Sequence, residues 1–348
     1  MRHRTAARVG TVLWLGALAA CGGDDRTRLV VYSPHGRDLL ALLERAFEQR
    51  RPDLDVRWLD MGSQEVLDRV RSERANPQAD IWFGGPHTIF ARGAAEGLLE
   101  PYRPSWADAI APGGADPEAR FFAAYLTPAV LVYNTDALSA DEAPRDWDDL
   151  LDPRFRGRVL IRDPLASGTM RAFFGMVLGR SLRETGDTAQ GMAWLRRLDA
   201  QTREYVLNPA LLYEKLSRGE GWVTVWDLPD ILLVQAQGRP LAYVLPASGT
   251  PVILDAIGLV RGAAHPDAAR AFIEFVGTPE AQLLAAHEAY RLPARTDLPA
   301  DALPEWARDV LAALVPAEID WATLAERSDE WMRWWDRHVR GTGARAAR

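Results

Sequence analysis

The sequence predicts an α/β fold built as two lobes, with mixed, mostly parallel sheets flanked by helices. Short apolar runs rich in β-branched residues alternate with segments whose apolar residues recur every three to four positions. This alternation is typical of repeated strand–helix units and of a sheet covered by helices on both faces. The chain has 348 residues, which is more than one hydrophobic core usually supports, so two lobes are expected.

The first series of elements begins directly after the N-terminal segment. Leu40, Leu43 and Phe47 fall on one face of the first predicted helix, and Gly97 closes the third one. The predicted strands are 29–32, 56–59 and 81–83, and the predicted helices surround 40–47, 66–70 and 88–95.

A second series has the same build. Its predicted strands are 130–133, 159–161 and 223–226, and its predicted helices are 168–178, 190–198 and 229–237. A long apolar strand at 252–260 and helices at 269–276, 305–314 and 321–339 complete the chain. We expect one lobe to comprise residues 28–132 and 252–298, and the other residues 133–251 and 299–341. The tryptophan stripe of the last helix, Trp331, Trp334 and Trp335, is predicted to pack in a core.

The N-terminus has the features of an export signal. Three arginines precede an apolar stretch at 9–20, and two small residues precede Cys21, the only cysteine. This pattern resembles the bacterial lipoprotein signal, and the stretch is shorter than the roughly 20 residues of a membrane-spanning helix. We therefore predict a signal peptide at 1–20, a lipid anchor on Cys21 and a tether at 21–27, with a buried or free thiol as the alternative.

Composition disfavours several classes of protein. The net charge of −7 and the absence of a basic run argue against nucleic-acid binding. No metal-ligand pair, nucleotide loop or cysteine–histidine cluster is present, so no metal site and no cofactor are predicted. His35, His87, Ser167 and Asp227 could form a catalytic triad only with a geometry that spacing does not show. Because no Gly-x-Ser-x-Gly motif surrounds the serine, we predict that the protein is not an enzyme.

Ligands of open parallel sheets bind at the carboxyl ends of the strands. In the first lobe, Ser33 and His35 follow the first strand, and an ordinary turn is the alternative interpretation. Gly84 and Gly85 follow Trp82 and would let backbone amides approach a ligand, or would simply form a tight turn.

The second lobe offers three further loops. Ser167, Gly168 and Thr169 open a helix and form the best anion cradle in the chain, with simple N-capping as the alternative. Trp226 and Asp227 suit a cationic group, or Asp227 caps the next helix. Tyr133 ends a strand between the lobes, where hinge geometry is its main expected role and lining of the cleft a secondary one.

The order of several short motifs resembles the extracellular solute-binding proteins of ABC importers, in the branch that includes ferric-ion, thiamine, sugar-phosphate and aminoalkylphosphonate binders. These motifs are Val31-Tyr32-Ser33, Ala79-Asp80-Ile81-Trp82, Val132-Tyr133-Asn134-Thr135, the segment Trp147 to Pro153, Asp163-Pro164, Ser167-Gly168-Thr169 and Arg291-Leu292-Pro293. The resemblance implies a Venus-flytrap (type II) fold whose strands cross between lobes near Tyr133 and Val252. It also implies a monomer in the periplasm or at the cell surface that delivers its ligand to an ABC permease and ATPase.

The resemblance also narrows the ligand. Ferric binders of this branch place adjacent tyrosines in the loop that corresponds to Trp226-Asp227, and no tyrosine lies between Ser217 and Ala242. We therefore expect a small anionic or zwitterionic solute, such as a phosphorylated, phosphonate or thiamine-like compound. Its anionic end would contact Ser33, Gly84-Gly85 and Ser167 to Thr169, and an amine would lie against Trp82, Trp226 and Asp227. Ferric-ion uptake and ligand sensing without transport remain the alternatives.

Overall fold

The computed structural model describes residues 26–342. Their strands are β1 (Thr27–Ser33), β2 (Leu54–Asp60), β3 (Ile81–Pro86), β4 (Leu99–Glu100), β5 (Phe122–Asn134), β6 (Val159–Arg162), β7 (Thr202–Val206), β8 (Val223–Asp227), β9 (Leu241–Val244), β10 (Val252–Val260) and β11 (Leu292–Pro293). Their α-helices are α1 (Arg37–Arg50), α2 (Ser63–Ser72), α3 (His87–Ala95), α4 (Gly168–Thr185), α5 (Ala189–Gln201), α6 (Pro209–Ser217), α7 (Leu228–Ala236), α8 (Pro266–Val276), α9 (Pro279–Ala289), α10 (Glu305–Ala313) and α11 (Trp321–His338). Short 3₁₀ helices lie at Ala107–Ala109, Trp147–Leu151, Pro153–Phe155 and Ala300–Ala302.

The two lobes share a mixed sheet whose strands follow the order β2-β1-β3-β10-β5-β8-β6-β7. β1 pairs in parallel with β2 and β3, and β6 pairs in parallel with β7 and β8. The central strands β10 and β5 instead pair antiparallel with their neighbours. The sheet is therefore less parallel than the sequence predicted, because β5 leaves the first lobe and β10 returns to it in the opposite direction.

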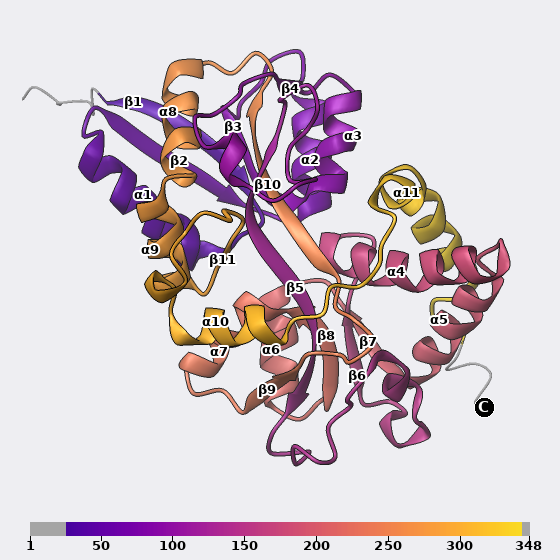
Figure 1. Cartoon of the computed structure of the whole chain (residues 1–348). Helices are drawn as coiled ribbons and strands as arrows, with labels where there is room; N and C mark the ends of the chain where they lie inside the picture. Colours follow the sequence, from indigo (N-terminus) through magenta and orange to yellow (C-terminus); the bar gives the residue numbers. More distant parts are fainter. Residues whose placement is uncertain (1–25, 343–348) are drawn as a thin grey trace, which may run out of the picture.

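The lobes are joined where β5 and β10 cross between them (Figure 1). Phe122 to Pro128 of β5 pair with β10, whereas Ala129 to Asn134 pair with β8 and β9. The change of partners falls at Pro128, opposite Val252. Proline has no backbone N–H, so it is tolerated where a strand leaves one ladder and enters another. The partners thus change a few residues before Tyr133, the position expected from the resemblance.

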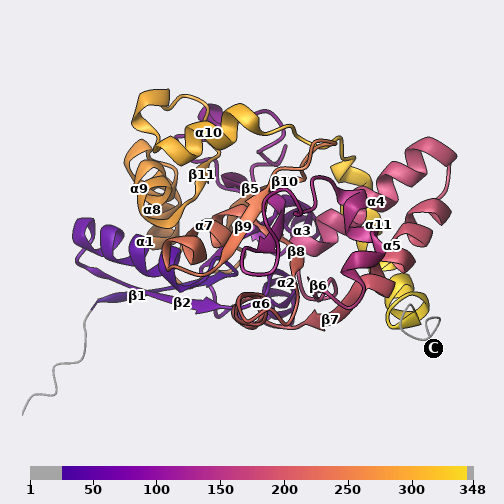
Figure 2. The ribbon, with the colours of Figure 1, turned by 90° about the horizontal axis from the view of Figure 1, so that it is seen from below.

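Helices cover both faces of each half of the sheet, as the view in Figure 2 shows. In the first lobe, one core lies under α1, α8 and α9 and a second under α2 and α3. The core of the second lobe includes residues of α4, α5 and α11. Trp331 and Trp335 are buried in it and Trp334 packs on its edge, which confirms the predicted core role of this stripe.

Most predicted elements are present, and the strand 252–260 has the expected bounds. α4 runs seven residues further than predicted and ends at Thr185, before Gly186, whose φ of +81° provides a left-handed helix cap. The elements α6, α9, β4, β7, β9 and β11 have no counterpart in the prediction. All but α9 have nine residues or fewer, and exposed apolar residues such as Leu211 of α6 weaken the periodicity on which the prediction depends.

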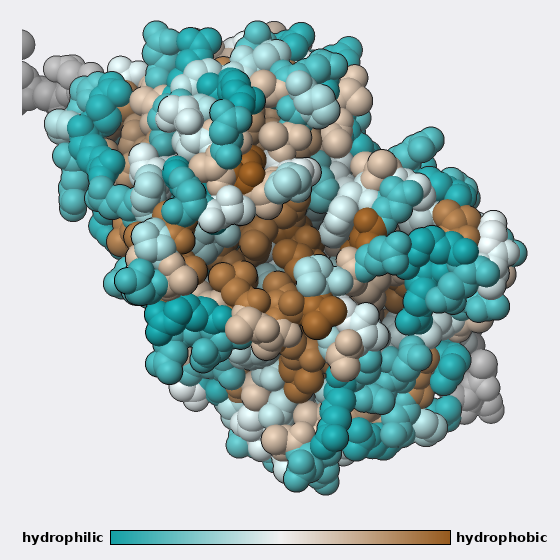
Figure 3. Space-filling model, viewed as in Figure 1, coloured by the Kyte–Doolittle hydropathy of each residue, from teal (hydrophilic) through white to brown (hydrophobic). Residues whose placement is uncertain are grey.

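The face seen in Figure 3 is hollowed between the lobes, and apolar side chains gather there over the crossing of β5 and β10. Leu126, Val252 and Leu254 of these strands are partly exposed. No helix within residues 26–342 is long and apolar enough to cross a membrane. Cys21 and the predicted signal peptide lie outside the described residues, so the lipid anchor stays a prediction.

Candidate functional site

A cavity of about 480 Å³ lies between the two lobes, at the carboxyl ends of the parallel strands. The first lobe contributes the loops after β1 and β2, the start of α1, and Arg291. The second lobe contributes Arg162 at the end of β6, the start of α6 and one face of α7. In Figure 2 the end of β2 lies beside α6. The volume and the position at the strand ends are typical of a small-molecule site in an open α/β sheet.

Two buried arginines, one from each lobe, line this cavity, and each is only 5% exposed. The Arg291 guanidinium donates to the carbonyl oxygen of His35 (3.1 Å) and to Oδ1 of Asp230 (3.2 Å). Arg162 donates to the carbonyl oxygen of Val206 (3.2 Å), and burial lowers its pKa. Neither Nε atom has a hydrogen-bond partner among the described residues. Both Nε atoms are themselves buried. The positive charge of the two guanidinium groups at the cavity suits an anionic ligand.

Carboxylates lie beside these arginines. Asp230 accepts hydrogen bonds at Oδ2 from the Tyr213 hydroxyl (2.6 Å) and from the Trp226 indole (3.2 Å). Burial, followed by the charge of Asp230, raises the pKa of Tyr213 well above its usual value, so the hydroxyl stays protonated. Asp60 also lines the cavity, and burial together with the charge of Asp230 raises its pKa. A site that presents both arginines and carboxylates can bind a zwitterion.

Of the two predicted residues of the first loop, His35 lines the cavity and Ser33 does not. Ser33 is buried, and its hydroxyl oxygen accepts the N–H of His35 (3.2 Å), so it shapes the turn after β1. His35 lines the cavity, and its ring packs on Phe83 with centroids 4.7 Å apart. Burial, and to a lesser extent the charge of Arg291, lowers the pKa of His35 well below its usual value, so the ring is neutral.

Gly84 and Gly85 lie inside β3. The sequence had instead suggested a loop or turn after this strand. Their φ angles are +96° and +94°, a region that favours glycine. A Cβ on Gly84 would lie 2.5 Å from the His35 ring, and the N–H of Gly85 donates to Oδ1 of Asp255 (3.1 Å). The two glycines thus let the end of β3 pack against the turn that carries Ser33 and His35.

The predicted anion cradle at the start of α4 is in contact with the opposite lobe. The Ser167 hydroxyl oxygen accepts the N–H of Met170 (3.2 Å), which is the N-cap arrangement. A Cβ on Gly168 would lie 2.5 Å from Cδ of Pro86, and neither Ser167 nor Gly168 lines the cavity. The lobes therefore touch at this loop, directly behind the cavity wall.

Thr169 and Asp227 join two elements of the second lobe. The Thr169 hydroxyl donates to Oδ2 of Asp227 (3.0 Å), whereas Oδ1 of Asp227 is buried without a partner among the described residues. Burial and the charges of Asp230 and Asp255 raise the pKa of Asp227 well above its usual value. Trp226 is buried, and its indole N–H is engaged by Tyr213 and Asp230, so it supports the site from behind.

Two predicted contact residues lie away from the cavity. Trp82 is buried in the first lobe and stacks on Phe90 with centroids 4.3 Å apart. Tyr133 is buried in the core of the second lobe, where β5 pairs with β8 and β9. Both aromatic rings face the cores in this structure, and neither lines the cavity. Packing in the lobe cores explains the aromatic side chains of Trp82 and Tyr133 without any contact with a ligand.

Several residues of the cavity had not been assigned a role from the sequence. Arg162 directly follows a predicted strand, so its place at a strand end was a usable signal. Arg291 belongs to one of the motifs of the family resemblance. Tyr213 lies on α6, a helix that the periodicity did not predict, and it carried no signal. In residues 26–342 no group of three or more histidine, cysteine or acidic residues is placed to hold a metal ion.

The family model for bacterial extracellular solute-binding proteins matches residues 76–312 of this chain. A probable ABC transporter periplasmic-binding protein of Sinorhizobium fredii is 27% identical over 308 residues, which cover 88% of this chain and 84% of that protein. A periplasmic protein of Salmonella typhimurium that is named for binding 2-aminoethylphosphonate is 28% identical over 281 residues, which cover 78% of this chain and 79% of that protein.

Solved structures show the same fold. AfuA of Actinobacillus pleuropneumoniae with fructose-6-phosphate bound superimposes with a TM-score of 0.80 at 26% identity, over 90% of this chain and 99% of that chain. Iron-bound HitA of Pseudomonas aeruginosa reaches a TM-score of 0.74 at 20% identity, over 88% of this chain and 98% of that chain.

The matched segment covers more than half of the chain and includes both crossing strands. The structure adds two lobes around a cavity at the strand ends, which is the arrangement that a binding protein requires. The chain belongs to the family of bacterial extracellular solute-binding proteins.

Proposed function

We propose that this protein is the substrate-binding component of an ABC importer and captures a small anionic or zwitterionic solute between its lobes. The observation that carries the proposal is the pair of buried arginines, Arg162 and Arg291, which line one cavity from opposite lobes. A phosphate or phosphonate group can accept several charged hydrogen bonds at once, so it suits two such side chains. Such a ligand would bridge the lobes and favour their closure.

The adjacent carboxylates favour a ligand that also carries a positive charge. Four carboxylates, those of Asp38, Asp60, Glu65 and Asp230, line the same cavity as the two arginines, and they would attract an ammonium group. Support comes from the S. typhimurium relative named for 2-aminoethylphosphonate and from the sugar phosphate held by AfuA. Phosphorylated, phosphonate and thiamine-like compounds are therefore the proposed classes. Delivery to a permease with its ATPase is supported by the name of the S. fredii relative.

The loops predicted from the sequence are proposed as secondary contacts. Ser33, Ser167 and Thr169 stand behind the cavity wall, where Gly168 meets Pro86. With the lobes in contact, these hydroxyl groups hold the loops that back the cavity wall. We propose that the arginines provide the main attraction and that these hydroxyls complete the site.

A thermal-shift screen tests the proposed ligand class. The purified protein is heated with 2-aminoethylphosphonate, fructose-6-phosphate, thiamine and its phosphates, inorganic phosphate, polyamines, simple sugars or Fe(III). A ligand at 100 times its dissociation constant stabilises the folded state by about 2.7 kcal/mol, which moves the melting temperature by roughly 2–4 °C in a chain of this size. A shift confined to phosphorus-containing compounds supports the proposal, whereas a shift with polyamines or neutral sugars alone contradicts it.

Iron uptake is the competing ligand assignment, and the same screen decides it. Iron-bound HitA has the same fold. In this chain, however, the hydroxyl of the cavity-lining Tyr213 stays protonated and donates a hydrogen bond to Asp230. Hard Fe(III) prefers deprotonated oxygen ligands. A shift with Fe(III) alone would overturn the proposed ligand class. Sensing without transport is tested separately, because deletion of an importer component abolishes uptake of the identified ligand and deletion of a sensor does not.

The remaining features of the proposal concern the whole chain. We propose that residues 1–20 are removed on export, that Cys21 carries the lipid anchor and that the mature protein is a monomer held at a membrane surface outside the cytoplasm. We also propose lobe limits at 132/133, 251/252 and 298/299, and a function without catalysis. Radiolabelled palmitate incorporated into the wild-type protein but not into a Cys21→Ser variant would support the anchor, and equal labelling of both would contradict it.

A further inference from the structure

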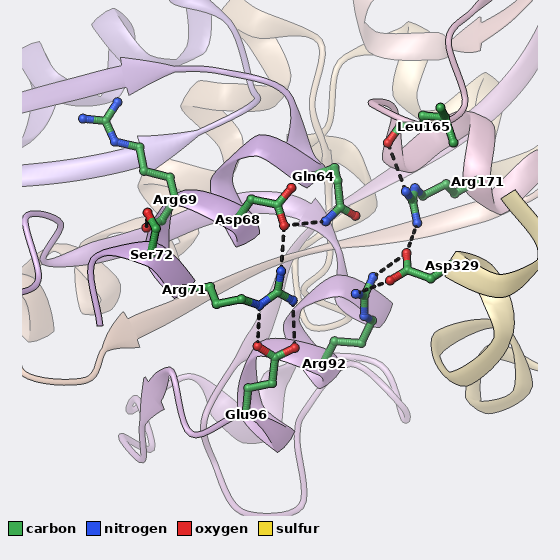
Figure 4. Close-up of polar contacts among 10 residues, drawn as sticks. All are labelled: Gln64, Asp68, Arg69, Arg71, Ser72, Arg92, Glu96, Leu165, Arg171 and Asp329. Atoms are coloured by element: carbon green, nitrogen blue, oxygen red, sulfur yellow. Dashed lines mark hydrogen bonds and ion pairs between the residues drawn. The ribbon is translucent and has the colours of Figure 1, made fainter. Parts of the chain in front are cut away.

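One carboxylate, Asp329 of α11, is held by two arginines outside the cavity (Figure 4). Arg92 of α3 binds it with both terminal nitrogens, and the Nη1–Oδ1 distance is 3.0 Å. Arg171 of α4 binds the same Oδ1 atom. Burial alone would raise the pKa of Asp329, but the two arginines outweigh it and hold the pKa below its usual value. We call these three residues the Asp329 clamp.

The Asp329 clamp joins the two lobes. The neighbours of Arg92 on α3, Ile89 and Phe90, are buried in the first-lobe core under α2 and α3. α11 instead buries Trp331 and Trp335 in the core of the second lobe, to which α4 also belongs. The Arg92–Asp329 contact is therefore an ion pair between bodies that move relative to each other when a binding protein of this fold opens.

The Asp329 clamp also reaches the loop behind the cavity. Arg171 is buried, and its other terminal nitrogen donates to the carbonyl oxygen of Leu165 (3.0 Å). This loop, residues 163–168, is the one that touches the first lobe. The carbonyl oxygen of Ala166 would lie 3.3 Å from a Cβ on Gly62, and Gly168 meets Pro86. One chain of contacts thus runs from the first lobe through Asp329 to the loop that carries Ser167.

We propose that the Asp329 clamp positions the 163–168 loop and holds the lobes in the arrangement in which they touch. Arg171 fixes the loop to Asp329 within the second lobe, and Arg92 fixes both to the first lobe. The importance of the clamp for ligand capture rests on the proposed function. Its effect on the lobe arrangement does not, because it can be measured without any ligand.

A matched pair of variants tests the clamp. Arg92→Ala removes the link between the lobes, whereas Arg71→Ala removes a comparable arginine whose partners, Asp68 and Glu96, lie in the same lobe (Figure 4). We expect Arg92→Ala to increase the radius of gyration in small-angle X-ray scattering without ligand. Amide hydrogens of residues 163–168 should exchange about tenfold faster, as expected for the loss of one charged hydrogen bond. Arg71→Ala should leave both quantities at the wild-type value.

A second variant and a ligand probe separate the possible failures. Asp329→Asn keeps the shape of the side chain and should change scattering and exchange in the same direction as Arg92→Ala. Wild-type scattering and exchange in both variants would overturn the proposal, and so would equal changes in Arg71→Ala. With 2-aminoethylphosphonate as probe, Arg92→Ala should bind about tenfold more weakly, because the binding-competent arrangement is less populated. If scattering and exchange respond and no phosphorus compound binds the wild type, the clamp stands and the proposed ligand class falls.

Discussion

Arg162 is the residue whose removal gives the clearest test of ligand binding. Arg291 also holds the carbonyl group of His35 and the carboxylate of Asp230, so its loss would disturb neighbouring loops. Arg162→Gln should weaken binding of an anionic ligand roughly 10- to 150-fold, which corresponds to about 1.5–3 kcal/mol for a hydrogen bond to a charged group. Titration calorimetry measures this. Arg203→Gln, an exposed arginine of the same lobe outside the cavity, is the control and should bind normally.

Ser167 allows a separation of its structural role from its proposed binding role. Its side chain caps α4, so Ser167→Ala should lower the free energy of unfolding by about 1 kcal/mol. Thr278 caps α9 in the same way, far along the chain and outside the cavity. Thr278→Ala should cost a similar amount of stability without an effect on ligand affinity. If the double variant Ser167→Ala with Thr169→Ala binds the ligand as tightly as wild type, these hydroxyls do not contact it.

The residues of the site were predictable to different degrees. Ser33, His35 and Ser167 were predicted because they follow strands, and the carboxyl ends of parallel strands meet at one edge. Trp82 was predicted as a contact for the same reason, yet its ring stacks on Phe90 inside the lobe. Whether a strand-end aromatic faces the cleft or the core depends on sheet pairing across the molecule, which the local sequence does not determine. Arg162 is the opposite case. The sequence analysis assigned it no role, although a charged side chain at the end of a buried strand can reach the cavity.

At the scale of elements, strands and helices with strong periodicity were predicted well, and those determined by tertiary contacts were not. β10 has its predicted bounds because nine consecutive residues, Val252 to Val260, are mostly apolar and are bounded by turn residues. β3 was predicted to end before Gly84, since two glycines usually indicate a turn. The structure continues β3 through both glycines because β10 pairs with this strand as far as Pro86, which lies opposite Asp255. Oδ1 of Asp255 also accepts the N–H of Gly85. Local sequence patterns do not predict a partner that lies 170 residues away in the chain.

The N-terminus of α4 determines how closely the lobes approach. Gly168→Ala would place a Cβ 2.5 Å from Cδ of Pro86, so the lobes would have to separate at this point. We expect a larger radius of gyration in scattering and a ligand affinity lowered by about tenfold or more. Gly179→Ala in the same helix is the control, because its nearest neighbour is the end of the Arg183 side chain at 4.0 Å. It should keep the affinity and gain roughly 0.5–1 kcal/mol of stability, since alanine favours the helix. Equal affinities of both variants would contradict the role of this contact.

For the whole molecule, a chain of polar contacts runs through the crossing strands. Asp255 of β10 accepts the N–H of Gly85 in the first lobe and the hydroxyl of Thr127 on β5. Asp227 and Asp230 of the second lobe lie near enough to influence one another's charge and that of Asp255. Arg291 faces the same group from the first lobe. The wall between the lobes is therefore polar and partly ionisable, so stability should depend on pH in a way that these residues determine.

Burial raises the pKa of Asp255 from its ordinary value of 3.8 to about 6 in the folded protein. Between about pH 4 and 6 the folded state then binds more protons than the unfolded state, so this group makes the protein more stable as the pH falls through 6. The contribution of His87 to stability changes with pH in the opposite direction. Burial lowers its pKa from 6.5 to about 4, so its contribution to stability is lost as the pH falls below about 6.5.

Two variants isolate these contributions in the intact protein. Between pH 7 and pH 5, wild type should gain about 1.3 kcal/mol of unfolding free energy relative to Asp255→Asn. Over the same range it should lose about 2 kcal/mol relative to His87→Gln. Urea unfolding at the two pH values measures both differences, with each variant compared with wild type at the same pH. If the difference in unfolding free energy between a variant and wild type is the same at both pH values, the substituted group titrates alike in the folded and unfolded chains. In that case the stability of the folded protein would not depend on pH through that residue.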